Sequence, residues 1–565
     1  MIPKSPRATS DRHVLVRRLT WMVATAAAFL IALYASRYEG SPAHVLFSIG
    51  IAATIGGVIV LLARRVLVAL VIVTALLAIV IGVSIKKQQA MNMVLHAYDI
   101  FFYPASWSTV LFLWHSYRFH VVGLVVAFLV TGLAVWLAYR IDDTRVERRT
   151  AALATLLLAS FSWLAASAKS ERNDAEFFFD DLYVSSFFSS WTETLETLWR
   201  GRLIVAAEKA DGPRFAVPKA CIPARQPPDI ILIHHESAVP PSFFAGLDYD
   251  RRLDDLFLSQ DKQLHKLRVE TYGGASWLTE FSVLTGLSTY HFGGMRPFVQ
   301  PVMAGKLHDT LPQMLELCGY RNVLVYPMLR NFVSNGTFYD SIGIVSVLDA
   351  AAQGAVEPNE RDRFYYTSAL DEMARHFSVS TSPLFVYVQT QSTHGSYDFT
   401  YRPEIDAAGG GPGTDPKVSE YLRRLAISQI DYRFLRSELA RRFPDRQFII
   451  LRYGDHQPDV TRGLLGDPET AARMIRTKGS PAFLTYYALD THNYTAPPLP
   501  KLDVVDVPYL GAILLDAARL PLPDSYRERR RLMWVCRGRY DGCARDGEIL
   551  AFHRRLIDSG LMDPM

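Results

Sequence analysis

Five apolar runs in the first 170 residues constrain the fold of this chain more than any other feature of its sequence. The runs lie at residues 19–36, 44–63, 66–85, 119–139 and 150–168. Each is close to the ~20 residues with which a helix crosses a bilayer. Five such runs in succession, nearly free of charge, do not fit the core helices of a globular domain. A cleaved signal peptide does not fit either, because the first run is long and no small-residue cleavage site follows it. We therefore predict an N-terminal domain of five transmembrane helices.

Basic residues beside these runs predict the orientation of the membrane domain. Five Lys and Arg residues precede the first run, Arg64 and Arg65 join the second and third runs, and four Arg residues join the fourth and fifth. Lys86 and Lys87, after the third run, are the contrary signal. The balance places the N-terminus in the cytoplasm, so five crossings place everything after residue 170 outside. We expect a multi-pass protein of the bacterial inner (plasma) membrane whose C-terminal domain lies in the periplasm or outside.

From about residue 228 the pattern changes to short apolar strands that alternate with helical stretches. Such alternation predicts an α/β domain with a mainly parallel central sheet. Several strands are continuous aliphatic runs, as in strands buried on both faces. The expected parts are a transmembrane domain at 1–170, an amphipathic connector at 171–227 and an extracytoplasmic catalytic domain at 228–565. The candidate strands are 229–234, 267–271, 322–326, 384–389, 447–452 and 482–488, and the candidate helices are 277–284, 310–317, 366–376 and 419–442.

All four Cys residues fall in the part that is expected outside. Cys536 and Cys543 flank a Gly-containing hexapeptide that can turn back on itself, which suits a disulfide in an oxidising compartment. Cys221 and Cys318 would form the second pair. A zinc site is the alternative, but the chain has no Cys-x-x-Cys and no His at ligand spacing. The net charge of +4 comes largely from basic loops beside the membrane runs, so no nucleic-acid partner is expected.

Four short segments place acids, hydroxyls and imidazoles where strand-like runs end or a helix-like run begins. They are residues 231–237, 272–277, 392–395 and 453–457. Open parallel sheets keep their ligand sites at such ends. Glu236 is a carboxylate suited to a hard or borderline divalent cation. His234 and His235 alternate across their strand, so at most one of them faces the site.

Ser276 opens a helix-like run directly after a Gly pair, where free N–H groups and the helix dipole favour negative charge. A plain N-cap serine is the alternative. Asp455 and His456 follow a strand, and Gly454 permits the turn with which both could bind one metal ion. His394 lies in a Gly- and Ser-containing turn past another strand, from which it could donate to a substrate or leaving-group oxygen. An ordinary surface histidine is the alternative for His394.

Taken together, these segments resemble the lipoteichoic acid synthase and phosphoglycerol transferase branch of the alkaline phosphatase/sulfatase superfamily, to which membrane phosphoethanolamine transferases are related. The resemblance implies a sulfatase-like catalytic domain in which Glu236, Ser276, Asp455 and His456 hold one divalent metal ion. Manganese is the expected ion, with zinc or magnesium as alternatives. The resemblance also implies that Ser276 is the catalytic nucleophile, with catalytic His394 near the substrate phosphate. The matching stretches are 229–237, 273–281, 311–320, 338–343, 393–394 and 454–458.

Three departures from the family pattern bear on the chemistry. Many relatives have Thr where this chain has Ser276, and either residue offers a hydroxyl. Residues 331–335 lack the Trp and Arg that lipoteichoic acid synthases carry for glycerol phosphate, which leaves the headgroup open. Sulfatases modify a Cys or Ser within Cys/Ser-x-Pro-x-Arg, but Leu278 and Glu280 occupy the Pro and Arg positions here, which argues against sulfate ester hydrolysis.

The expected function is metal-dependent transfer of a phospholipid headgroup, phosphoglycerol from phosphatidylglycerol, through a covalent intermediate on Ser276. The expected partners are a phospholipid donor, an extracytoplasmic glycan or glycolipid acceptor, and the membrane itself. One alternative is a phosphoethanolamine transferase that acts on lipid A or a glycan. Others are a sulfatase-like phosphodiesterase or hydrolase with water as the acceptor, and a binding protein with an inactive catalytic domain.

Overall fold

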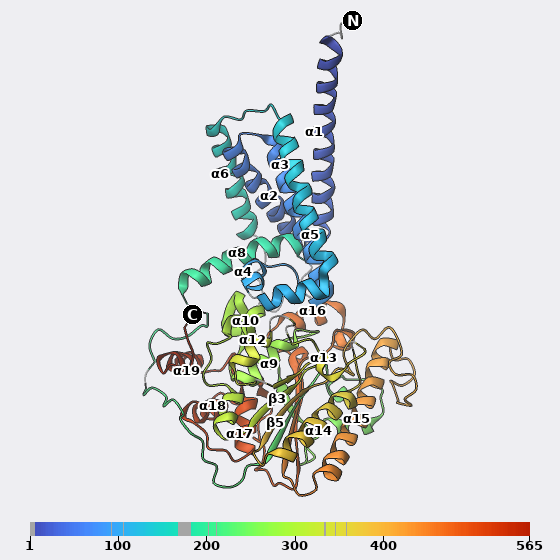
Figure 1. Cartoon of the computed structure of the whole chain (residues 1–565), viewed down its shortest axis with the longest axis vertical. Coiled ribbons are helices and arrows are strands. Elements are labelled where there is room, and N and C mark those ends of the chain that lie inside the picture. Colours follow the sequence, from blue (N-terminus) through green and yellow to red (C-terminus); the bar gives the residue numbers. More distant parts are fainter. Residues whose placement is uncertain are drawn as a thin grey trace. The chain divides into compact units, whose positions relative to one another are not determined.

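A computed structural model of the chain describes residues 6–91, 93–105, 107–167, 182–201, 203–210, 212–330, 332, 335–344, 346–357 and 359–564. The chain forms two compact units, Met1–Glu196 and Thr197–Met565, which we treat separately (Figure 1). The division falls inside the range that was expected to be a connector, of which residues 171–181 lie outside the described residues. The three-part organisation stays a prediction.

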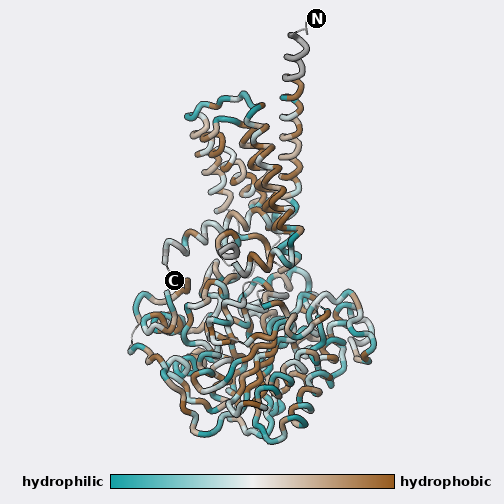
Figure 2. Tube along the Cα trace, in the orientation of Figure 1, coloured by the Kyte–Doolittle hydropathy of each residue, from teal (hydrophilic) through white to brown (hydrophobic). Residues whose placement is uncertain are grey.

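Among its described residues, the first unit contains five helices that are long and apolar enough to cross a membrane, as the sequence predicted. Figure 2 shows their predominantly hydrophobic residues. The apolar stretches are Val14–Ser36, Pro42–Ala63, Val66–Met91, Thr109–Ile141 and Arg148–Ser167. The helices that carry them are α1 (Pro6–Ser36), α2 (Pro42–Ala63), α3 (Val66–Met91), α5 (Trp107–Ile141) and α6 (Arg148–Ser167), with a short α4 (Ala97–Ala105) before α5. Helix α2 packs against α3 and α6, and α1 packs against α3.

Asp142 fixes the tight link between α2 and α3. Arg64 ends α2 in a left-handed conformation (φ 60°), and α3 begins two residues later. The Asp142 carboxylate accepts a hydrogen bond from the Leu67 backbone N–H at 2.8 Å, which satisfies one free donor at the start of α3. The Arg65 guanidinium in turn donates to the carbonyls of Tyr139 and Asp142. The basic link is therefore anchored to the end of α5.

The second unit is built on an eight-stranded sheet with the order β4-β3-β5-β1-β6-β7-β2-β8. Five neighbouring strand pairs are parallel, and only the two pairs that β7 makes are antiparallel, so the prediction of a mainly parallel sheet is confirmed. All six predicted strands exist. The two that the sequence missed, β4 and β8, are too short to form an apolar run. The strands are β1 (Asp229–His235), β2 (His265–Arg268), β3 (Arg321–Val325), β4 (Ser346–Leu348), β5 (Leu384–Gln389), β6 (Phe448–Gly454), β7 (Leu484–His492) and β8 (Val505–Asp506).

The central strands are buried on both faces, which explains their continuous aliphatic runs. Ile231 and Ile233 of β1 pack in one core with helices α14 (Asp362–Val379) and α15 (Pro416–Arg442). Ile230 and Leu232 alternate with them, point to the opposite face, and are also buried. The predicted helices correspond to α14, α15, α9 (Ser276–Thr285) and α11 (Leu311–Leu317), and α9 packs against α11 and α17 (Leu510–Ala517).

Both expected disulfides are present, Cys221–Cys318 and Cys536–Cys543, and none of the four cysteines is free. The alternative of a cysteine zinc site is therefore wrong. The two disulfides close loops of very different length, because their cysteines are 97 and 7 residues apart in sequence.

This difference predicts unequal effects on stability. Restricting the unfolded chain is worth about 4.7 kcal/mol for the 97-residue loop and about 2.4 kcal/mol for the 7-residue loop in the loop-entropy model. We therefore expect the Cys221→Ser/Cys318→Ser double variant to lower the melting temperature of the second unit more than Cys536→Ser/Cys543→Ser does. Differential scanning calorimetry of the full chain in detergent measures both against the unchanged protein. Equal losses would contradict the loop-length argument.

Candidate metal centre

Two parallel strands end side by side at the edge of the sheet where the polar residues gather. Strands β1 and β6 are neighbours, and His235 pairs with Gly454 in their register. Glu236 and Asp455 follow these two residues directly and so leave the sheet together. The Ser237 backbone N–H donates to Asp455 Oδ1 at 2.7 Å, which locks the two strand ends to each other. A Cβ at residue 454 would lie 2.1 Å from the Ala238 carbonyl oxygen, so only glycine permits this approach.

Ser276 is brought to the same edge by a turn with unusual backbone conformations. Gly273, Gly274 and Ala275 all have positive φ (72°, 156° and 62°), and α9 begins directly after them at Ser276. A positive φ costs a non-glycine residue such as Ala275 energy, which fixed contacts around it must offset. One such contact joins the Gly273 backbone N–H to the Gln457 carbonyl at 2.8 Å. The Thr279 hydroxyl also donates to the Asp455 carbonyl at 2.7 Å.

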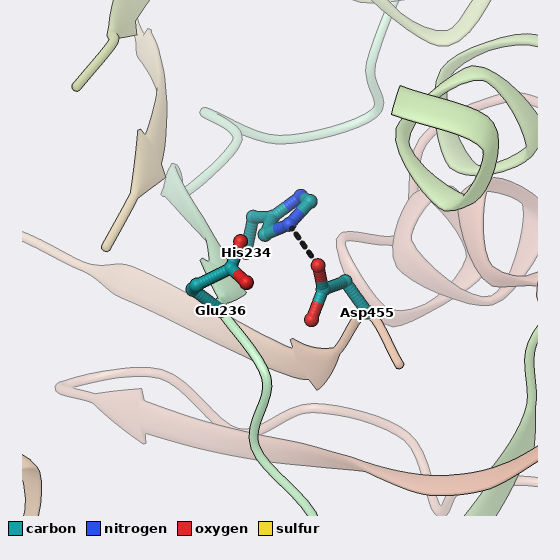
Figure 3. Close-up of side chains that lie close together, drawn as sticks. All are labelled: His234, Glu236 and Asp455. Atoms are coloured by element: carbon teal, nitrogen blue, oxygen red, sulfur yellow. Dashed lines mark ion pairs between the residues drawn. The ribbon is translucent and has the colours of Figure 1, made fainter. Parts of the chain in front are cut away.

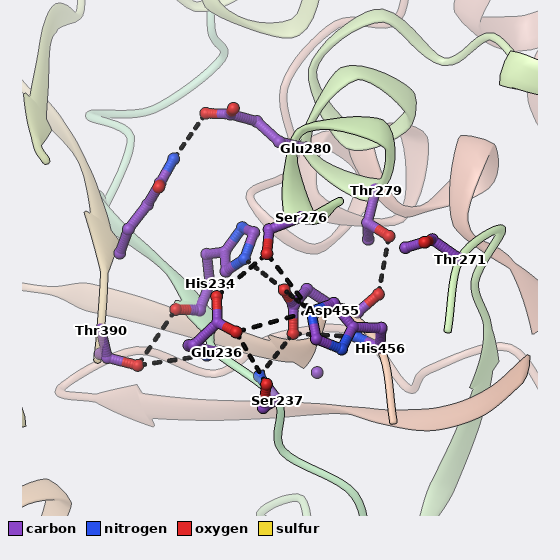
Figure 4. Close-up of polar contacts among 12 residues, drawn as sticks. His234, Glu236, Ser237, Thr271, Ser276, Thr279, Glu280, Thr390, Asp455 and His456 are labelled. Carbon is purple, nitrogen blue, oxygen red and sulfur yellow. Dashed lines mark hydrogen bonds and ion pairs between the residues drawn. The ribbon is translucent and has the colours of Figure 1, made fainter. Parts of the chain in front are cut away.

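The structure brings Glu236, Ser276, Asp455 and His456 together (Figure 4). The Ser276 hydroxyl donates to Glu236 Oε2 at 3.0 Å and lies 3.3 Å from His456 Nε2. His456 Nε2 is 3.3 Å from Asp455 Oδ2 and 3.5 Å from Glu236 Oε1. Ligands bound at ~2.1 Å in a tetrahedron are ~3.4 Å apart. The spacing of these four side chains therefore fits ligands around a single cation.

His234 is a fifth candidate ligand, on which the sequence alone did not decide. His234, Glu236 and Asp455 offer ligand atoms that lie within 4.8 Å of one another (Figure 3). His234 Nε2 and Asp455 Oδ2 are both buried and pair with each other at 3.1 Å, while no hydrogen bond of regular geometry holds either atom among the described residues. The two atoms therefore face the same point, at which a bound ion would satisfy both. His235 points to the other face of β1, where its ring meets the hydroxyls of Tyr486 and Ser428 at 2.7 and 2.8 Å.

Two tyrosines orient the His234 ring. His234 Nδ1 lies 3.1 Å from the Tyr387 hydroxyl and 3.0 Å from the Tyr453 hydroxyl, and the two hydroxyls are 2.7 Å apart. The tyrosines belong to β5 and β6, which flank β1. A partner of this kind on one ring nitrogen is what orients the other nitrogen of a metal-binding histidine. Sequence reasoning missed both tyrosines, because a tyrosine inside an apolar strand looks like any core residue.

Charges within the site shift the pKa values of its buried groups. Burial alone would raise the pKa of Asp455, but His456 and His234 bring it well below its usual range. Burial alone would lower the pKa of His234, but Asp455 and Glu236 raise it above its usual value. A proton and a cation therefore compete for His234. Burial, followed by the charge of Arg452, lowers the pKa of His235 to about 3, so His235 is neutral.

His394 lies in a loop that contacts the site, but its ring does not bond to the other four predicted residues. The neighbouring Thr393 hydroxyl donates to the Glu236 carbonyl. The half-buried His394 ring lies with Nδ1 2.7 Å from the Gly395 carbonyl. Within the described part of the chain, no hydrogen bond or ion pair joins this ring to Glu236, Ser276, Asp455 or His456. Its role near the substrate phosphate stays a prediction.

Glu280, one turn past Ser276 on α9, anchors this helix to neighbouring elements through hydrogen bonds. Its buried carboxylate accepts hydrogen bonds from the Tyr339 hydroxyl at 2.9 Å, from Gln389 Nε2 at 2.6 Å and from Gln300 Nε2 at 2.8 Å. Burial raises its pKa. The sequence singled out Glu280 only because it departs from the sulfatase pattern. In the structure it ties the helix that carries Ser276 to β5.

The two adjacent histidines of β1 offer a matched test of the fifth ligand. We expect His234→Ala to weaken Zn²⁺ binding by roughly 10–100-fold, the range found when a metal site loses a supporting group. His235→Ala removes the same atoms from the opposite face and should leave Zn²⁺ affinity unchanged. Isothermal titration of the metal-free full chain measures both affinities, with thermal melting as a check on folding. Equal affinities of His234→Ala and the unchanged protein would remove His234 from the site.

Residues 267–485 match the family model described as Sulfatase, a range that includes Ser276, His394, Asp455 and His456. A curated relative, an uncharacterized protein of Haemophilus influenzae, is 22% identical over 319 residues. This match covers 54% of the chain and 56% of the relative, so the chain spans little more than half of that relative's length.

Several solved structures are similar to this chain at low sequence identity and with TM-scores below 0.5. The phosphoglycerol transferase GacH of Streptococcus pyogenes, in complex with sn-glycerol-1-phosphate, is 16% identical with a TM-score of 0.47, over 70% of this chain and 96% of GacH. The lipooligosaccharide phosphoethanolamine transferase EptA of Neisseria meningitidis, an integral membrane protein, is 12% identical with a TM-score of 0.48, over 90% of this chain and 99% of EptA. The lipoteichoic acid synthase LtaP of Listeria monocytogenes is 14% identical with a TM-score of 0.40, over 57% and 78%. Residues 267–485 thus match a model of the superfamily that the sequence resembles.

Proposed function

We propose that this chain transfers the headgroup of a phospholipid, phosphoglycerol from phosphatidylglycerol, to a hydroxyl of an extracytoplasmic glycan or glycolipid. One observation carries the proposal: the Ser276 hydroxyl lies between the Glu236 carboxylate and the His456 imidazole at the first residue of α9. The proposal includes a bacterial plasma membrane location with the catalytic domain outside. It also includes the division into a membrane domain at 1–170, a connector at 171–227 and a catalytic domain at 228–565.

Ser276 has the surroundings of a nucleophile. Its proton is already directed at Glu236, and its side chain is only half-buried, so a substrate can reach it. The free N–H groups and positive dipole end of α9 favour the negative charge of a phosphoryl group beside Ser276. Glycines at 273 and 274 leave the backbone there accessible.

Glu236, Ser276, Asp455 and His456 are the residues that would hold a divalent metal ion, with His234 as a further ligand. Bound there, such an ion would stabilise charge on the phosphoryl oxygens and favour the ionised hydroxyl. Manganese is the ion expected from the sequence, although carboxylates, a hydroxyl and one imidazole do not discriminate sharply among manganese, zinc and magnesium. The imidazole of His234, as a second nitrogen ligand, would shift the metal preference toward zinc. Nitrogen ligands suit Zn²⁺ better than they suit manganese or magnesium, which prefer oxygen ligands.

The reaction we propose has two balanced steps. Ser276 Oγ gives its proton to Glu236 Oε2, to which it is hydrogen-bonded, and bonds to phosphorus while the bond from phosphorus to the diacylglycerol oxygen breaks. The released oxygen takes a proton from His394, the proposed donor, and diacylglycerol leaves. The headgroup is then held on Ser276 as a phosphodiester. In the second step an acceptor hydroxyl gives its proton to His394 and bonds to phosphorus, the bond to Oγ breaks, and Oγ takes its proton back from Glu236.

The covalent step can be tested directly by mass spectrometry of the Ser276 peptide from protein purified out of its native membrane. We expect a phosphoglycerol adduct, which disappears in Ser276→Ala. A phosphoethanolamine adduct would keep the mechanism and assign the other headgroup. An unmodified Ser276, even after incubation with both lipids and Mn²⁺ or Zn²⁺, would contradict the proposal and favour a hydrolase or a binding protein.

Substitutions of Ser276 separate the hydroxyl from the rest of the site. We expect Ser276→Ala to lose release of diacylglycerol from labelled phosphatidylglycerol in proteoliposomes, and Ser276→Thr to keep a measurable share because it retains a hydroxyl. Ser437→Ala, at an exposed position on α15, is the control and should match the unchanged protein. Undiminished release by Ser276→Ala would exclude Ser276 as the nucleophile.

A further inference from the structure

The first unit contains a groove of about 310 Å³ between three of its membrane helices. Each helix turns one face to it: Ala28, Ala32 and Ala35 recur along α1 at the spacing of a single helical face. Most of the wall is apolar, and seven of its apolar residues are small. Those small residues are Ala28, Ala32, Ala35, Ala52, Ala53, Gly56 and Ala69.

One end of the groove is polar. Glu39 and Ser48 line it and are only 8% and 7% exposed. Glu39 Oε1 accepts hydrogen bonds from the Val184 and Ser185 backbone N–H groups at 3.1 and 3.2 Å, where α8 (Tyr183–Arg200) begins. Among the described residues, no hydrogen bond of regular geometry reaches Glu39 Oε2 or Ser48 Oγ, although the Ser185 and Ser48 hydroxyls lie near enough to the carboxyl to lower its pKa. A fixed, buried carboxylate thus keeps one oxygen for a donor from outside the protein.

The length of the groove fits one leaflet of a bilayer. From Ala28 to Ser36, the lining of α1 spans nine residues of helix, a rise of about 12 Å. Half of a hydrocarbon core is ~15 Å thick. If all five helices cross, as proposed above, four crossings separate the loop after α1 from the chain after α6. The two segments therefore lie on the same side of the membrane. The polar end of the groove then belongs to the leaflet that supplies the proposed lipid donor.

We propose that this groove binds diacylglycerol, with one acyl chain along the small residues and the free hydroxyl donating to Glu39 Oε2. The identity of the lipid rests on the proposed function, which releases diacylglycerol in its first step whichever headgroup is moved. The acid at the polar end selects among lipids. Burial raises the pKa of Glu39, so a neutral hydroxyl donor suits its surroundings, whereas the ionised carboxylate would repel the phosphate of an intact phospholipid.

Two substitutions change the groove at its two ends. Glu39→Gln keeps an oxygen for the N–H groups of α8 and replaces the free oxygen with an NH₂ group, which cannot accept the lipid hydroxyl. Gly56→Leu fills the apolar part: a Cβ there would meet only Val73 at 3.6 Å, an ordinary contact, so the side chain extends into the groove. Gly132→Leu on α5 is the matched control, because a Cβ there has nothing within 4 Å.

The experiment is photolabelling of the full chain in nanodiscs with a diacylglycerol that carries a photoreactive acyl chain. We expect labelled peptides from α1, α2 and α3, at least a fivefold lower yield in Glu39→Gln and Gly56→Leu, and an unchanged yield in Gly132→Leu. Unlabelled dioleoylglycerol should compete in the unchanged protein, a result that does not depend on how the variants fold. Equal labelling by phosphatidylglycerol, phosphatidylethanolamine and phosphatidylcholine probes, or equal labelling of all variants, would overturn the proposal.

The groove and the proposed function can fail separately. Ser276→Ala should be labelled like the unchanged protein, because the groove lies wholly in the first unit. A headgroup adduct on Ser276 without groove-dependent labelling would remove the diacylglycerol site and keep the transferase. Groove-dependent labelling without any adduct would keep the lipid site and remove the transferase.

Discussion

The candidate site depends on how Asp455 is held. Its Oδ1 accepts two backbone hydrogen bonds, from Ser237 at 2.7 Å and from His456 at 2.9 Å, and its carbonyl accepts the Thr279 hydroxyl. One residue thereby joins the end of β1, the end of β6 and the helix that begins with Ser276. With Oδ1 occupied, Oδ2 is left to face His234 and His456 at 3.1 and 3.3 Å. The backbone therefore decides which carboxylate oxygen is offered to a cation, before any cation is present.

Much of this arrangement could be predicted because parallel strands bring their carboxyl ends to one edge. Glu236 and Asp455 are 219 positions apart by residue number, yet each follows a strand of continuous apolar residues, and the two strands are neighbours. The choice between His234 and His235 could not be predicted. Alternation along a strand places their side chains on opposite faces of the sheet, but it does not show which face carries the site. The short strands β4 and β8 left no pattern. The conformation of the His394 loop depends on distant contacts such as that of buried Arg424, which donates to the His394 carbonyl at 2.6 Å.

The surroundings of the site were hidden for a related reason. Tyr387, Tyr453 and Glu280 are buried polar residues whose partners come from other elements, and nothing in their local sequence marks these partners. The groove in the first unit was hidden by composition. Alanine and valine raise the hydropathy of a run whether they pack tightly or leave space, so the pattern that predicts a membrane helix cannot report a hollow beside it. Glu39 lies between two apolar runs, where an acid is unremarkable in sequence.

The Cys221–Cys318 bond has a consequence for how the site is assembled. It closes a covalent ring of chain that contains Glu236 and Ser276, while Asp455 and His456 lie far beyond the ring in sequence. The two halves of the ligand set meet only when β6 has taken its place beside β1, a strand inside the ring. During synthesis, which proceeds from the N-terminus, the first half is complete while the second is still unmade. Occupancy by a cation would therefore report that the pairing of β1 with β6 at the centre of the sheet has formed, which makes the site a natural checkpoint for the maturation of that part of the domain.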